Sequence, residues 1–155
     1  MLRGTRKRAH DRLRIAGATH AALAVLHPQT GAPWVSRIAL APGPDGAPMS
    51  LVSTLAPHTA ALAADPRAAL LIGTPETRGD PLTYPRLTLQ AEARFIARDA
   101  PDHADWRAHY LRLRPKAKLY IDFADFRLVS FRPQSAALNG GFGQAYALTL
   151  HDLGL

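Results

Sequence analysis

Residues 51–71 read LVSTLAPHTAALAADPRAALL, an order of residue types that predicts a strand, a turn, a short helix and a second strand. Thr59 should cap the start of the helix, because its hydroxyl can accept from the free N–H groups of a first turn. The helix should end near Asp65, since Pro66 disfavours helical geometry in the residue before it. Residues 68–72 are apolar and predict a buried strand.

The turn between the first strand and the helix is rich in hydrogen-bond donors. Ser53 and Thr54 carry hydroxyls, His58 carries an imidazole, and Thr59 stands at the expected first turn of the helix. Donors gathered at a helix N-terminus suit a phosphate or another anion. The alternative is a plain capped turn without a ligand, and local chemistry alone does not choose between the two.

Length and composition restrict the class of protein. The chain has 155 residues and no cysteine. Its length fits one domain, and the lack of cysteine excludes disulfides, thiol catalysis and zinc–thiolate sites. No apolar run approaches the ~20 residues that a membrane-spanning helix needs. The basic start has no apolar signal core behind it, so we expect a cytoplasmic protein with no membrane partner.

Positive charge is concentrated in two segments of a chain whose net charge is +7. Residues 1–18 form the first, and residues 5–16 within it have the pattern of a basic amphipathic helix that precedes the main domain at residues 19–155. The second is the run at residues 107–118. Neither contains a helix-turn-helix, zinc-finger or RNA-recognition pattern, so we interpret both as solvated surfaces and expect no nucleic-acid partner.

Alternating and apolar runs predict six strands. They cover residues 20–26, 34–40, 51–54, 68–72, 86–96 and 126–132. Most connections are short, and a further helix should begin at Pro101 and end before Pro115. This pattern predicts a mainly β (α+β) fold, a small antiparallel β-barrel with flanking helices.

Arg37 is a charged residue in the middle of a predicted strand. Within residues 34–40, Ser36 shares one face with the large apolar side chains, whereas Arg37 shares the other face with Val35 and Ala39. A long charged side chain at such a position either extends to solvent or holds an anion.

Three other patterns carry no function in our interpretation. Residues 141–143 read GFG but lack the third glycine and the βαβ unit of a dinucleotide-binding fold, so a turn explains them. The seven histidines show no i, i+4 pair, and no metal site is predicted. Asp122 and Asp125 are interpreted as solvated turn residues rather than a carboxylate pair. No catalytic residue is assigned.

Four segments, taken in order, resemble one protein family. They read STLAPHTAALAADPRAALLIG, GDPLTYPRLTLQAEA, YIDFADFRLVSF and NGGFGQAYAL. Together they resemble the pyridoxamine 5'-phosphate oxidase-related, FMN-binding split-barrel superfamily, and within it the branch that includes the haem-utilisation proteins. The similarity covers about residues 19–150. It implies a six-stranded split β-barrel and a homodimer with FMN sites at the subunit interface.

The resemblance also implies a set of cofactor-binding residues. Arg37 matches a strand arginine that approaches the flavin phosphate, and His58 with Thr59 matches the loop that cradles it. Residues 53–55 match the strand end along the flavin ring and ribityl chain, and Gln90 lies on a strand that reaches the flavin from the same or the partner subunit. The implied site residues are Arg37, Ser53, Thr54, Leu55, His58, Thr59 and Gln90.

The chain departs from the family pattern in the same loop. Ala60 and Ala61 stand where many haem-utilisation relatives carry a basic residue and an asparagine, so the loop has fewer fixed charges. The C-terminal substrate-binding motif of the pyridoxamine enzymes is not recognisable. Vitamin B6 oxidation is therefore not expected.

Three functions follow from the resemblance. The first is a dimeric FMN-dependent oxidoreductase of unknown substrate. The second is a haem-binding or haem-degrading protein of the same fold, with His58 or His151 as the candidate axial ligand. The third is a non-catalytic flavin-binding module. FMN is preferred to haem, because the donors of the turn suit a phosphate and because His151 lies on a short tail that we expect to be mobile.

Overall fold

The structure is a computed structural model that describes residues 17–141 and 143–155. The helix predicted at residues 5–16 lies outside the described residues, so the basic N-terminal segment stays a prediction.

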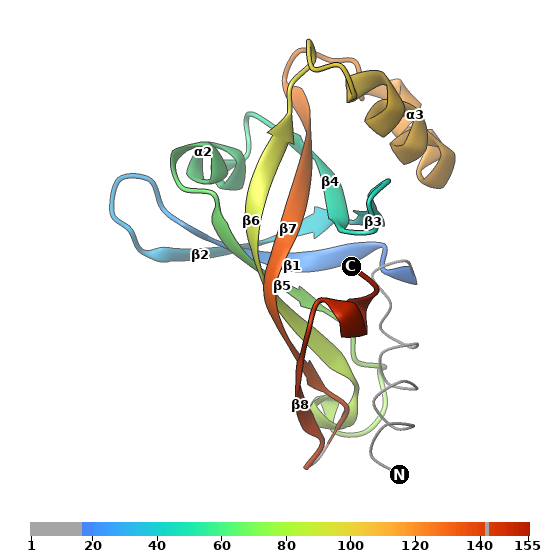
Figure 1. Cartoon of the computed structure of the whole chain (residues 1–155). Coiled ribbons are helices and arrows are strands. Elements are labelled where there is room, and N and C mark those ends of the chain that lie inside the picture. Colours follow the sequence, from blue (N-terminus) through green and yellow to red (C-terminus); the bar gives the residue numbers. More distant parts are fainter. Residues whose placement is uncertain (1–16, 142) are drawn as a thin grey trace.

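The described residues form one curled sheet with two α-helices (Figure 1). The strands are β1 (His20–Leu26), β2 (Pro33–Ala39), β3 (Ala41–Pro42), β4 (Pro48–Ser53), β5 (Arg67–Ile72), β6 (Arg86–Ile96), β7 (Phe126–Asn139) and β8 (Ala145–Leu148). The helices are α2 (Pro57–Ala64) and α3 (His103–Leu113), with 3₁₀ turns η2 (Pro81–Thr83), η3 (Pro115–Leu119) and η4 (His151–Leu153). All six predicted strands are present, and β3 and β8 are short additions.

The sheet has the strand order β2-β1-β5-β6-β7-β4-β3, with β8 paired to β7, and every pair is antiparallel. It curls until the two ends of this order approach each other. There the Ser50 hydroxyl on β4 donates to the Ala39 carbonyl on β2 at 2.6 Å. The mainly β, antiparallel split-barrel prediction is therefore confirmed.

Helix α2 covers one end of the barrel, and its start corrects the sequence prediction. It begins at Pro57, two residues before Thr59, and no side chain caps it. Proline is favoured at the first helical position because it has no N–H to leave unpaired. The Thr59 hydroxyl instead donates to the Ser53 carbonyl at 2.5 Å, which ties the helix to the end of β4. The predicted end at Asp65 is confirmed.

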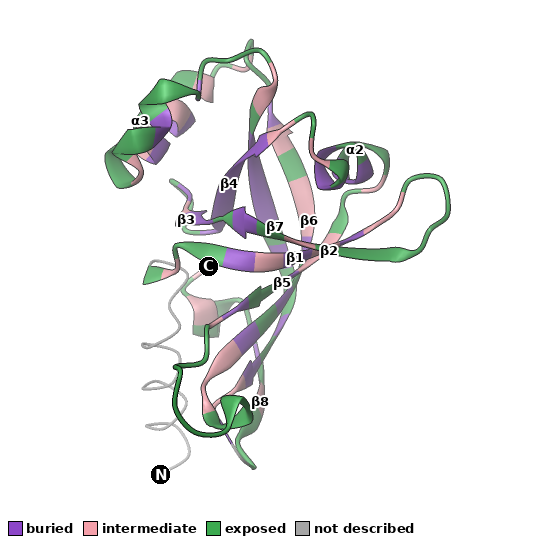
Figure 2. Cartoon of the chain, turned by 180° about the vertical axis from the view of Figure 1, so that it is seen from behind, coloured by how far each residue is buried: buried purple, intermediate pink, exposed green. Residues whose placement is uncertain are grey.

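The interior is divided into two hydrophobic cores. The main core lies inside the barrel, under α2 (Figure 2). The second lies under α3, where Trp106 and Tyr110 pack against the far ends of β4, β6 and β7. Helix α3 begins at His103 rather than at Pro101, which belongs to the preceding turn. Arg114, just after α3, donates to the carbonyls of Ala18 at 3.1 Å and Leu40 at 2.6 Å and so fastens this helix to the barrel.

Strand β7 is twice as long as the sequence predicted, because its central proline sits at an irregularity. The register shifts between Gln90 and Ala91, where Ser135 and Pro133 are the respective partners and Gln134 is left over. A β-bulge tolerates proline, since the ladder hydrogen bond is already broken there. The bulge lets β7 continue past residue 132, where the predicted strand ended.

The C-terminal tail is also more ordered than predicted. Residues His151–Leu153 form η4, and the Leu155 amide donates to the Leu150 carbonyl at 3.0 Å. Leu153 and Leu155 pack against the main core. Apolar burial therefore holds the tail, which the sequence prediction of mobility did not anticipate.

Candidate functional site

The turn from β4 into α2 holds five of the seven predicted site residues, and its donors are largely used within the protein. The Ser53 hydroxyl donates to the Asp125 carboxylate at 3.3 Å and accepts from the Leu55 amide at 3.1 Å. The Thr54 amide donates to the Asp125 carbonyl at 2.6 Å. The Thr54 side-chain hydroxyl and His58 Nε2 form no hydrogen bond with a described residue, and Leu55 is 83% exposed. The turn is thus a closed hydrogen-bond network rather than an open cradle.

Asp125 is the residue of this network that sequence reasoning missed. We had interpreted it as a solvated turn residue, but it is half-buried and bound to Ser53, which lies 72 positions earlier. The pairing of Ser53 with Phe126 in the ladder between β4 and β7 brings the two residues together. Nothing in the local sequence signals this contact. Asp122, in contrast, is exposed as expected and pairs with Arg107 at 2.6 Å.

His58 is oriented by a serine from another strand. Its Nδ1 lies 2.9 Å from the hydroxyl of Ser36 on β2, and the residue is only 9% exposed. Burial lowers the pKa of His58 below 6.5, because the interior disfavours a charged imidazolium. The imidazole is therefore neutral at pH 7. The strand alternation could have indicated Ser36, since a hydroxyl on an apolar face needs a partner.

Arg37 lies on the opposite side of β2 from Ser36, on a surface that we call the outer face. Register places Arg37 and Val35 beside Ala22 and Ala24 of β1, and these beside Leu71 and Ala69 of β5. The outer face consists of Ala22, Ala24, Val35, Arg37, Ala69 and Leu71. Val35 is 64% and Leu71 43% exposed, so the face is apolar and open.

The side chain of Arg37 forms no hydrogen bond or ion pair with any described residue. Because Arg37 is exposed, this unpaired state carries no burial cost, contrary to the expectation that an unpaired charge there would be expensive. The guanidinium is a donor that the fold leaves available.

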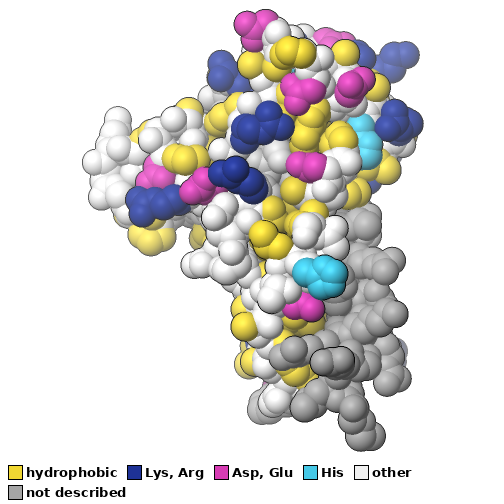
Figure 3. Space-filling view, viewed as in Figure 1, with side chains coloured by type: hydrophobic (Ala, Val, Ile, Leu, Met, Phe, Trp, Pro, Cys, Tyr) yellow, Lys and Arg dark blue, Asp and Glu magenta, His cyan; other side chains and the backbone are white. Residues whose placement is uncertain are grey.

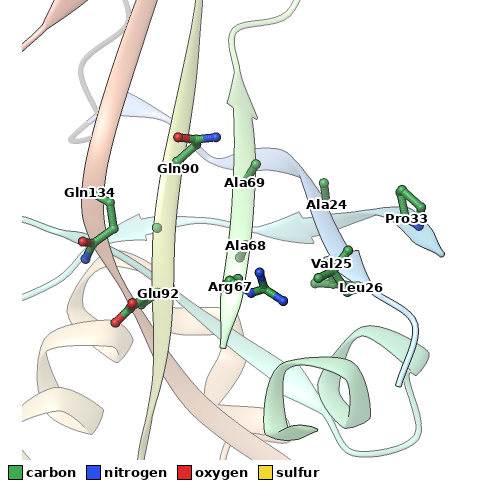
Figure 4. A pocket seen from close by; sticks show the side chains of 11 residues that line it. Ala24, Val25, Leu26, Pro33, Arg67, Ala68, Ala69, Gln90, Glu92 and Gln134 are labelled. Atoms are coloured by element: carbon green, nitrogen blue, oxygen red, sulfur yellow. The ribbon is translucent and has the colours of Figure 1, made fainter. Parts of the chain in front are cut away.

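Gln90 continues the outer face on β6. It pairs with Ala69, and its side-chain oxygen accepts from the Ser135 hydroxyl at 2.8 Å. Gln90, Ala69 and Ala24 lie side by side on three neighbouring strands (Figure 4). They line a hollow of ≈ 440 Å³ together with Val25, Leu26, Pro33, Arg67, Ala68, Ala91, Glu92 and Gln134.

The fold brings together five of the seven predicted site residues, which share the turn: Ser53, Thr54, Leu55, His58 and Thr59. Arg37 follows Ser36, the serine that holds His58, but lies on the opposite side of β2, on the outer face. Gln90 is separated from β2 by β1 and β5. It is in register with Val35 rather than with Arg37, and with strands about 4.8 Å apart it lies roughly 14 Å across the sheet from β2. The predicted set is thus divided between the turn and the outer face.

Among the described residues, histidines and carboxylates do not gather into a metal site. Within residues 17–141 and 143–155, no group of three or more His, Asp or Glu side chains could hold a metal ion. His151 is exposed on η4. On the face shown in Figure 3, basic side chains are interspersed with acidic ones. None of the described helices is long and apolar enough to cross a membrane.

The chain is similar to one protein family and to a related protein of known name. A profile of the family described as pyridoxamine 5'-phosphate oxidase matches residues 8–139. The non-canonical heme oxygenase HOZ, chloroplastic, of Arabidopsis thaliana is 36% identical over 117 residues, which are 75% of this chain and 34% of the relative. The chain thus spans about a third of that relative's length.

Two solved structures show the same fold. A heme binding protein from Mycobacterium smegmatis has a TM-score of 0.79 and 34% identity, over 96% of this chain and 59% of that one. HutZ, named as the heme storage protein of Vibrio cholerae, has a TM-score of 0.72 and 22% identity, over 82% and 90%. Relatives of this chain thus include proteins named for haem.

Proposed function

Because this chain belongs to the pyridoxamine 5'-phosphate oxidase family, we propose that it is a haem-binding member of the branch that serves haem utilisation. The sequence alone favoured FMN. The neutral, oriented His58 and the named relatives move the balance towards haem.

The observation that carries the proposal is the outer face with its unpaired arginine. Haem is a flat apolar ring that bears carboxylates. A surface of alanines with Val35 and Leu71 offers the ring a flat apolar contact, since small side chains leave room beside the strands. Arg37 at the edge of this surface presents a planar fork that matches a carboxylate.

Two histidines are candidates for the axial ligand. His58 is neutral and its Nδ1 is held by Ser36, the arrangement in which a second hydrogen bond orients a metal-binding imidazole. His151 is exposed, on a turn whose neighbouring leucines pack on the core. His58 is the better oriented of the two but lies with Ser36 on the opposite side of β2 from the outer face, and His151 is the more accessible.

FMN remains the second candidate, and Arg37 also favours it. A guanidinium binds a phosphate as readily as a carboxylate. In this reading, Arg37 would hold the phosphate, residues 53–55 would line the ring and ribityl chain, and Gln90 would reach the flavin. Flavin would supply redox chemistry when bound.

Either cofactor is proposed to bind a homodimer at the subunit interface. The outer face exposes Val35 and Leu71 beside the half-buried alanines, an area that a second copy of the chain would cover. Light scattering at micromolar concentration should give twice the chain mass. A monomer that still binds its cofactor would contradict a shared site.

Parallel titration of the apo-protein with haemin and with FMN tests the cofactor. We expect sub-micromolar haemin affinity with a Soret band. His58→Ala and His151→Ala, measured side by side, identify the ligand as the variant that changes the Soret band. Micromolar or tighter FMN binding together with no saturable haemin binding would overturn the haem proposal and favour the flavin.

A further inference from the structure

We propose that a second hollow, beside the start of α3, binds small molecules that have an apolar body and a carboxylate. We call it the α3 hollow. It shares no lining residue with the outer face or with the hollow next to Gln90. The proposal therefore goes beyond the cofactor proposed above and does not depend on it.

The α3 hollow lies where the segments that lead into α3 and into β7 come together, at one end of the sheet (Figure 1). Its volume is ≈ 330 Å³. Its lining includes four side chains that are at most 8% exposed, namely Leu51, Ile96, Ile121 and Leu128. Ligand sites are mostly apolar and occupy about 300–1,000 Å³, so the α3 hollow suits a small molecule with an apolar body.

Arg98 fixes the two sides of the α3 hollow relative to each other. It follows β6, and its guanidinium donates to the carbonyls of Phe123 and Phe126, at the start of β7. The hollow is therefore preformed, and a ligand would not have to order these two segments on binding.

The ionisable side chains that line the α3 hollow are all basic. They belong to Arg98, His103 and Arg127, and no Asp or Glu is among the lining residues. Arg127 is exposed and forms no hydrogen bond or ion pair with a described residue. Its guanidinium is therefore available, and a guanidinium can bind a carboxylate through two parallel N–H bonds.

The carboxylates nearest in sequence have other partners. Asp122 pairs with Arg107 at 2.6 Å, and Asp125 accepts from the Ser53 hydroxyl at 3.3 Å. Arg127 is thus left without a carboxylate of the protein, and we expect a ligand to supply one. The apolar lining selects the body of this ligand, and Arg127 selects its charge.

Titration of the whole chain with 3-phenylpropanoate and with 3-phenylpropanamide separates the charge from the apolar body. Calorimetry should give a Kd below about 1 mM for the carboxylate and binding about fivefold weaker or worse for the amide. Arg127→Gln should weaken binding of the carboxylate about fivefold or more and binding of the amide less than about twofold. Arg78→Gln, which removes the same charge from a residue outside the hollow, should change neither affinity.

A second pair of variants tests the position of the ligand. Ala124→Phe places a ring at a lining residue and should weaken binding of both compounds about tenfold or more. Ala108→Phe makes the same change at an exposed position of α3 outside the hollow and should weaken neither. Thermal unfolding verifies that each variant is folded.

Three results would each overturn the proposal: no saturable binding of 3-phenylpropanoate below about 10 mM, equal affinity for the carboxylate and the amide, or unchanged carboxylate binding in Arg127→Gln. Equal losses in Ala124→Phe and Ala108→Phe would also contradict it, because binding would then lie elsewhere. None of these measurements uses haemin or FMN, so their outcome is separate from that of the cofactor titrations.

Discussion

The turn between β4 and α2 and the outer face of β1, β2 and β5 differ in how much of their chemistry the fold has already used. In the turn, hydroxyls and amides bond to one another and to Asp125. On the outer face, Arg37 bonds to no described residue and stands beside open apolar side chains. Polar residues in the first region therefore stabilise the protein, whereas the arginine in the second is available for a ligand.

Arg37→Ala should give the largest change, and it should appear in binding alone. The variant should weaken haemin and FMN binding by about 1.5–3 kcal/mol, the range for hydrogen bonds to charged groups. Riboflavin has no phosphate and should bind as before. Stability should not change, because Arg37 is exposed and unpaired.

Calorimetric titration measures these affinities, and Arg78→Ala is the control. Arg78 is exposed in the loop between β5 and β6, so its loss removes the same charge from a residue that is not part of the outer face. Equal losses for FMN and riboflavin in the Arg37 variant would count against a role in holding the anion.

Thr59→Val should show the reverse behaviour. The change removes the hydroxyl that joins α2 to the Ser53 carbonyl, at a position only 4% exposed. We expect the free energy of unfolding to fall by about 0.5–1.5 kcal/mol, because the Ala56 amide still donates to that carbonyl. Urea denaturation measures the change.

Thr54→Val is the matched control for the turn. The Thr54 hydroxyl is exposed and bonds to no described residue, so its removal should alter stability by less than about 0.5 kcal/mol. A comparable loss in both variants would mean that the two hydroxyls are not distinguished as the structure indicates.

His58 should make stability depend on pH in a definite direction. Its folded pKa is lowered from 6.5 by burial, so the unfolded chain binds a proton more readily than the folded one. The stability that neutral His58 contributes is therefore present above pH 6.5 and is lost as the pH falls towards its folded pKa. His58→Gln should flatten this part of the stability–pH curve measured by thermal unfolding. A curve of unchanged slope in the variant would contradict the assignment.

Leu55→Ser should produce the smallest change. Leu55 is 83% exposed in the turn, so its replacement removes almost no buried apolar surface. The free energy of unfolding should change by less than about 0.5 kcal/mol. A larger loss in chemical denaturation would show that Leu55 packs against the protein in solution.

Local sequence signals identified most elements but misplaced several boundaries. The end of α2 was predicted correctly from Pro66, and side-chain alternation predicted the observed limits of β6, Arg86–Ile96. The predicted helix start at Thr59 was too late, because Pro57 is favoured at the first helical position. The predicted strand end at residue 132 was too early, because the bulge at Gln90 and Ala91 tolerates Pro133, which has no N–H to donate.

By itself, the sequence determined the strands, the two helices and the two faces of β2, because side-chain alternation and proline geometry act over a few residues. Only the tertiary structure decided which donors remain free. Ser53 meets Asp125 across 72 positions, and His58 meets Ser36 across 22, through sheet register and barrel curvature. Alternation put Arg37 on one face of its strand, but whether that face is covered depends on how the whole sheet curls. Such contacts depend on long-range packing, so they cannot be predicted from local residue patterns.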